Sequence, residues 1–135
     1  GLCRVIHAIN CGPLIEWAHL APAVHGAVPA RVLVRTRPQA AVDHWDSRFS
    51  AFAPATLEYL ADLGVRLVGI DTPSVDPADS PHLPCHQVLR QRQMRVLENL
   101  VLDEVPEGDY ELIALPLKLT TADASPVRAV LRSLA

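Results

Sequence analysis

The residues best suited to chemistry lie between positions 82 and 98. His82, Cys85 and His86 form a first group, and Glu98 follows twelve residues after His86. Imidazole, thiolate and carboxylate groups are the side chains that bind zinc in proteins. This stretch is therefore the candidate for a metal site, provided that the fold brings two or more of these side chains together.

A self-contained zinc site built from His82, Cys85 and His86 is disfavoured. The two histidines have the i, i+4 spacing that places side chains on one face of a helix. However, Pro84 lies between them, and a proline inside a helix removes a hydrogen bond and clashes with the preceding turn. We therefore do not expect one continuous helix to carry both histidines.

The pair His86 and Glu98 can share a metal only if the chain reverses between them. Twelve residues of straight helix would separate them by ~18 Å, whereas zinc ligands each lie ~2 Å from the metal. A shared metal requires a short helix over residues 87–93 and an extended return through residues 95–98, which the apolar pattern after residue 95 permits. Without this reversal, His86 would be a helix-capping histidine and Glu98 a surface glutamate.

The segment that precedes these residues indicates an α/β fold. Residues 54–63 have the pattern of a helix, with a proline in the first turn, leucines at helical spacing and Gly64 after the last turn. The helix leads directly into an apolar strand at residues 65–70, which is typical of a sheet covered on both faces. Because sites in α/β folds lie at the carboxyl ends of strands, we expect any chemistry beside the loop at residues 71–77.

The rest of the chain alternates between strand and helix patterns. Further strands are expected at residues 3–9, 31–36 and 109–118, where Pro116 marks a bulge or an edge position. A helix weakened by Pro22 is expected at residues 14–24. The tail from Ser125 fits a capped amphipathic helix better than a strand.

Composition narrows the class of protein. The 135 residues are 50% hydrophobic with a net charge of −3, which indicates one globular domain without the basic patch of a nucleic-acid-binding surface. No apolar run approaches the roughly 20 residues that span a membrane. Three cysteines without a CxxC motif favour a reducing compartment over a disulfide framework. Because Met94 is the only methionine and the chain begins within a strand pattern, we expect it to be part of a longer protein.

Several segments together resemble a known family. Residues 65–77 (VRLVGIDTPSVDP), 86–100 and 103–132 (DEVPEGDYELIALPLKLTTADASPVRAVLR) are similar to the C-terminal two-thirds of the bacterial kynurenine formamidases, within the cyclase family of metal-dependent hydrolases. Residues 3–7 and 31–36 also resemble that family. The resemblance implies a swivelling layered α/β domain with a mixed β-sheet, N-terminally truncated and covering residues 1–135. It also implies a strand, and not a helix, at residues 126–132.

The function implied by this resemblance is zinc-dependent hydrolysis of N-formyl-L-kynurenine to L-kynurenine and formate, in tryptophan degradation. The implied protein is a cytoplasmic homodimer with a small-molecule substrate and no nucleic-acid or membrane partner. His86 and Glu98 match two metal ligands of the family. The family's other ligands and its acid/base histidine lie in an H-x-G-T-H-x-D-x-P-x-H motif that this sequence lacks. No catalytic residue is therefore assigned here, and the chain alone is expected to be inactive.

Two other classes of function stay open. The chain can be a non-catalytic remnant of the same fold that serves as an interaction domain. It can also belong to a cyclase-family hydrolase that acts on a different amide or on a lactone. In the formamidase that the resemblance implies, the loop at residues 71–77 is expected to form the wall of the pocket and is assigned no catalytic role.

Overall fold

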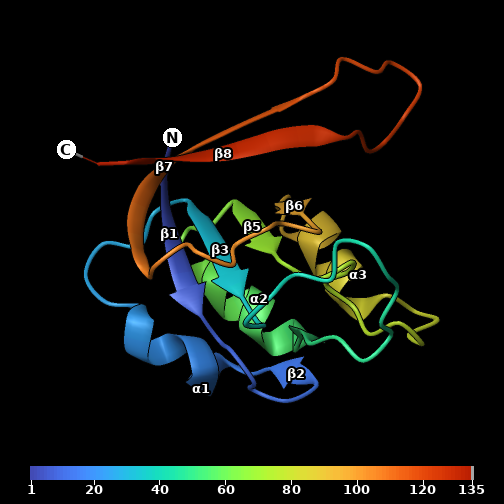
Figure 1. The fold of residues 1–135 in the computed structure, drawn as a ribbon, viewed down its shortest axis with the longest axis horizontal. Helices are drawn as coiled ribbons and strands as arrows, with labels where there is room; N and C mark the ends of the chain where they lie inside the picture. Colours follow the sequence, from blue (N-terminus) through green and yellow to red (C-terminus); the bar gives the residue numbers. More distant parts are fainter. Residues whose placement is uncertain (135) are drawn as a thin grey trace.

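A six-stranded mixed sheet forms the centre of the computed structural model, which describes residues 1–134 (Figure 1). The strand order is β6-β5-β3-β1-β7-β8, in which the first four strands are parallel and the last two are antiparallel to their neighbours. The predicted α/β class with a mixed sheet is therefore confirmed. The strands are β1 (Leu2–His7), β3 (Arg31–Arg35), β5 (Leu67–Ile70), β6 (Arg95–Leu97), β7 (Gly108–Pro116) and β8 (Val127–Ser133).

The helices pack together on one face of this sheet. In β3 the side chains of Val32 and Val34 face the helices, whereas Leu33 between them faces the other side, as the two-residue period of a strand requires. Among residues 1–134, no helix combines the length and the apolar character needed to cross a membrane. The helices are α1 (Trp17–Leu20), η1 (Ala21–Ala23), α2 (Pro54–Asp62) and α3 (Pro84–Gln91).

Helix α2 confirms the helix predicted at residues 54–63. Pro54 occupies the first turn, and Leu57 and Leu60 are fully buried against the sheet. After the C-cap residue Leu63, Gly64 takes a φ of +90°, a left-handed conformation that glycine adopts without steric cost. This turn sends the chain directly into β5, which begins at Leu67.

The helix predicted at residues 14–24 is largely wrong. The segment starts as the short strand β2 (Leu14–Ile15), which pairs with β4 (Ala51–Phe52). Only four residues of α-helix follow, and Pro22 then lies in the first turn of the 3-10 helix η1. The carbonyl oxygen of Ile15 accepts hydrogen bonds from the Ala53 N–H and the Thr56 hydroxyl, so tertiary contacts outweigh the local pattern.

The tail forms a strand, as the family resemblance implies and contrary to the helical pattern of its residues. Strand β8 pairs with β7 from Tyr110 opposite Ser133 to Pro116 opposite Val127. Pro116 lies beyond the part of β7 that pairs with β1, which agrees with the predicted edge position. Figure 1 shows the β7–β8 hairpin extending as an arm away from the helices.

Candidate metal centre

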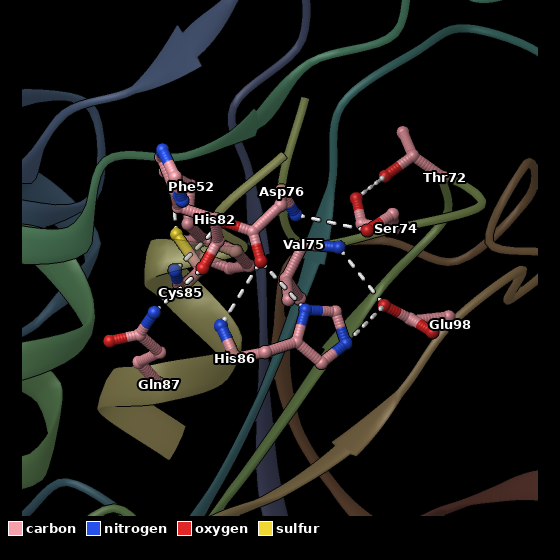
Figure 2. Close-up of polar contacts among 10 residues, drawn as sticks. All are labelled: Phe52, Thr72, Ser74, Val75, Asp76, His82, Cys85, His86, Gln87 and Glu98. Atoms are coloured by element: carbon pink, nitrogen blue, oxygen red, sulfur yellow. Dashed lines mark hydrogen bonds and ion pairs between the residues drawn. The ribbon is translucent and has the colours of Figure 1, made fainter. Parts of the chain in front are cut away.

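The chain reverses between His86 and Glu98, as a shared site requires. Helix α3 ends at Gln91, and Gln93 adopts a positive φ of 55° that turns the chain back into β6, which runs parallel to β5. Glu98 follows β6 directly. As a result, Nε2 of His86 lies 3.7 Å from Oε1 of Glu98 (Figure 2). The expected reversal and extended return are therefore confirmed, whereas the helix covers Pro84–Gln91 and not residues 87–93.

A third side chain, Asp76, holds the imidazole of His86 from the opposite side. Its Oδ2 lies 2.6 Å from Nδ1 of His86, and Asp76 is 0% exposed. An ionised carboxylate only accepts hydrogen bonds, so Nδ1 carries the ring hydrogen. In the neutral imidazole, the other ring nitrogen, Nε2, then has a free lone pair on the side that faces Glu98.

Asp76 also caps helix α3. Its Oδ1 accepts a hydrogen bond from the Cys85 N–H at 2.7 Å, and its Oδ2 accepts one from the His86 N–H at 3.1 Å. Residue Leu83 at the helix start has no capping side chain of its own. Burial acts to raise the pKa of Asp76, but the hydrogen bonds from His86 and from these two N–H groups outweigh it and hold that pKa below its usual value.

Glu98 is held by the same loop. The N–H of Val75 donates a hydrogen bond to Oε1 of Glu98 at 3.0 Å. Two backbone hydrogen bonds attach the segment that follows Glu98, from the Asn99 N–H to the Thr72 carbonyl and from the Leu100 N–H to the Ile70 carbonyl. Successive residues of one loop thus contact both predicted metal ligands.

The loop at residues 71–77 therefore does more than form a pocket wall, and the sequence interpretation missed Asp76. The available signal was its position in the loop after a buried strand, at the edge of the sheet where α/β proteins place their sites. Nothing in the spacing of ten residues indicates that its carboxylate contacts His86. That contact depends on the turn that places Asp76 at the start of α3.

His82 and Cys85 do not join the site. Helix α3 begins at Pro84, so His82 precedes the helix and is exposed. Cys85 is fully buried, and its thiol donates to the Phe52 carbonyl at 3.0 Å. Burial, and next the charge of Asp76, raise the pKa of this thiol far above its usual value. These contacts agree with the rejection of a self-contained site.

The donors that converge here suit a divalent metal such as zinc. They are an imidazole nitrogen with a free lone pair and a carboxylate, on side chains that are 39% and 27% exposed. Catalytic zinc sites hold three protein ligands. Within residues 1–134 no set of three His, Cys, Asp or Glu side chains is arranged around one point as a metal site would require. The pair His86 and Glu98 would therefore supply two of the ligands that such a site needs.

Two apolar hollows adjoin the pair, both between the body of the sheet and the β7–β8 hairpin. His86 lines a cavity of about 590 Å³ together with Leu67, Met94 and Leu97. Glu98 lines a groove of about 840 Å³ that continues along β8. The candidate ligands thus lie at the edge of space that can hold an apolar group.

The chain matches known proteins over almost all of its length, although no protein-family model matches it. It is 68% identical to the kynurenine formamidase of Paracidovorax citrulli, over 98% of this chain and 63% of that protein. It is 69% identical to the kynurenine formamidase of Delftia acidovorans, over 100% of this chain and 64% of that protein. The chain therefore spans slightly less than two-thirds of these relatives.

The fold matches a solved structure as well. A protein described as a potential metal-dependent hydrolase with cyclase activity superimposes with a TM-score of 0.83 at 32% identity. The superposition covers 97% of this chain and 64% of that one. It confirms the layered α/β fold with a mixed sheet that the sequence resemblance implied.

Proposed function

Because this chain is a homologue of the kynurenine formamidases, as its sequence resemblance indicated, we propose that it forms part of a zinc-dependent hydrolase of N-formyl-L-kynurenine. The products would be L-kynurenine and formate. One observation supports the proposal beyond sequence similarity: Nε2 of His86 lies 3.7 Å from Oε1 of Glu98, while Nδ1 is occupied by Asp76.

In the proposed mechanism, His86 would hold the metal through Nε2 and Glu98 would hold it through a carboxylate oxygen. Zinc, when bound, would polarise the formyl carbonyl as a Lewis acid. Further ligands and the acid/base group would come from the part of the relatives that this chain does not span. Leu67, Met94 and Leu97 line the cavity beside His86 and would hold the aromatic ring of the substrate out of water.

We propose that residues 1–135 belong to one domain of a cytoplasmic homodimer in tryptophan degradation. All three cysteines are free thiols, which suits a reducing compartment. Leu115 and Leu117 on the β7–β8 hairpin are 75% and 57% exposed, which suits a surface covered by another subunit.

The ligand assignment is tested in the protein at its natural length with the variants His86→Ala and Glu98→Ala. We expect each to lower zinc content and turnover of N-formylkynurenine together, by about 100-fold or more in turnover, because the metal supplies several kcal/mol of transition-state stabilisation. His82→Ala removes a nearby exposed histidine and is the matched control, which should leave both quantities unchanged.

Full activity and full zinc content in both variants would remove the assignment. If zinc binds but N-formylkynurenine is not turned over, assays with other formamides and with lactones separate a related hydrolase from a non-catalytic domain. Turnover of one of these substrates would favour the former. A folded protein that neither binds zinc nor hydrolyses any of them would favour an interaction domain.

A further inference from the structure

We propose that Asp76 is a positioning residue that prepares His86 to bind a metal, and that the loop of residues 74–76 holds both ligands of the pair in place before the metal arrives. This inference rests on the proposed function, because it takes His86 and Glu98 as metal ligands. It adds a residue that neither touches substrate nor binds metal. Asp76 would act on the metal only through the imidazole of His86 (Figure 2).

Asp76 selects the tautomer of His86. A histidine binds a metal through a nitrogen without hydrogen, and the partner of the other nitrogen decides which one that is. The carboxylate of Asp76 requires a hydrogen on Nδ1, at 2.6 Å. Nε2 is thereby left as the acceptor, and Nε2 is the nitrogen that faces Glu98 at 3.7 Å.

Asp76 is itself held in place by several hydrogen bonds. Its two oxygens accept from the N–H groups of Cys85 and His86, at 2.7 and 3.1 Å, in addition to the imidazole. Its own N–H donates to the hydroxyl of Ser74 at 3.1 Å. Rotation of the carboxylate would leave two N–H groups at the start of α3 without partners, which is costly at a buried position.

The same loop also holds Glu98, the second ligand of the proposed pair. Val75, the residue before Asp76, donates its N–H to Oε1 of Glu98 at 3.0 Å. One oxygen of Glu98 is thereby held, and the side-chain torsions are restricted. Adjacent residues of one loop thus set the orientation of the imidazole and of the carboxylate, and such preorganisation of supporting contacts increases metal affinity.

The test is Asp76→Asn in the protein at its natural length, with Asp79→Asn, between this loop and α3, as the matched control. Asp79 is exposed, so its replacement should change nothing at the site. In Asp76→Asn, the amide oxygen would stay on the Cys85 N–H and the amide NH₂ would face Nδ1 of His86. An NH₂ group only donates, so the ring hydrogen would move to Nε2.

Two measurements follow. Zinc affinity, determined by competition with a chromophoric chelator, should fall by about 10- to 100-fold in Asp76→Asn and stay unchanged in Asp79→Asn. The ¹⁵N NMR shifts of the His86 ring, recorded without metal at about pH 8, where an ordinary histidine is neutral, should show hydrogen on Nδ1 in the wild type and on Nε2 in Asp76→Asn. A purely structural role for Asp76 would not exchange the two ring nitrogens.

A wild-type spectrum with hydrogen on Nε2 would overturn the inference, and this measurement needs no variant that could fail to fold. Unchanged zinc affinity in a folded Asp76→Asn would also overturn it. Failure of the proposed function looks different. In that case His86→Ala would bind zinc as well as the wild type, while the wild-type spectrum would still report whether Asp76 fixes the tautomer.

Discussion

Two buried aspartates in one loop, Asp71 and Asp76, carry out different tasks. Both follow β5, and they are 4% and 0% exposed. Asp71 accepts hydrogen bonds from the N–H and the hydroxyl of Thr36, at 2.7 to 3.0 Å, and from the N–H of Arg37 at 3.3 Å. These donors belong to the end of β3, so Asp71 joins the carboxyl ends of two neighbouring strands.

Asp76 differs from Asp71 in the nature of one donor. Its imidazole partner, His86, has a second nitrogen that reaches a cavity and another carboxylate. Burial and the number of hydrogen bonds do not separate the two aspartates. Under the proposed function, Asp76 acts on a metal site because its donor His86 has a second nitrogen, whereas the donors of Asp71 have no group that reaches beyond the hydrogen bond.

Among the variants that test the comparison of Asp71 with Asp76, Asp71→Asn should show the largest loss of stability. The amide keeps one acceptor oxygen but turns an NH₂ group toward donors from Thr36 or Arg37, at a buried position. We expect the free energy of unfolding to fall by about 2–3 kcal/mol. Urea unfolding followed by circular dichroism measures this loss. Zinc affinity of the folded variant should stay within about threefold of the wild type, because the contacts of His86 are unchanged.

The opposite pattern would break the comparison. If Asp71→Asn lowered zinc affinity as much as Asp76→Asn while keeping its stability, the two aspartates would share one role. Asp79→Asn serves again as the control for any effect of a lost charge near this loop.

A smaller effect is expected at Asp109, which accepts from a permanent cation. Arg4 donates to its two oxygens at 2.7 and 3.0 Å, and that hydrogen-bonded pairing lowers the pKa of Asp109. Stability from this pair is fully present above the unfolded-state value of about 3.9 and is lost as pH falls through the lower folded-state value. Because the Asp109 side chain is 36% exposed, solvent screening leaves about 1 kcal/mol.

Unfolding measured between about pH 5 and pH 2 should therefore show a shallower loss of stability in Asp109→Asn than in the wild type. Equal slopes for both proteins would show that the carboxylate makes no net contribution. The zinc affinity of Asp109→Asn should equal that of the wild type, which extends the comparison to a third carboxylate.

Local patterns in the sequence predict the frame of the site but not its supporting contacts. The reversal between His86 and Glu98 was predicted as the condition for a shared metal, because a straight helix would hold the two side chains too far apart and the residues after Arg95 have the apolar pattern of a strand. The contact of Asp76 with His86 was not predictable. It depends on where α3 starts, and Leu83 at that start adopts a left-handed φ of 46° that no sequence pattern there indicates.

Two other segments, residues 14–24 and strand β8, show the same limit. The segment at residues 14–24 was predicted from local periodicity, but the hydrogen bonds of Ile15 to Ala53 and Thr56 decide its structure. Strand β8 has a helical pattern of apolar residues, yet it lies along β7 as the family resemblance implied. In both cases hydrogen bonds to another segment, and not the local pattern, set the conformation.

The residues of the candidate metal centre are close together in the sequence, and this has a consequence for folding kinetics. The contacts of Asp76 and Val75 with the two ligands join residues 10 and 23 positions apart, whereas Arg4 and Asp109 are 105 positions apart. Closing a short loop costs less entropy than closing a long one. We expect pulsed hydrogen exchange to protect the amides of residues 85–98 before those of residues 109–112. The ligand pair would then be in place, and able to bind metal, before strand β7 of the β7–β8 hairpin has paired with β1.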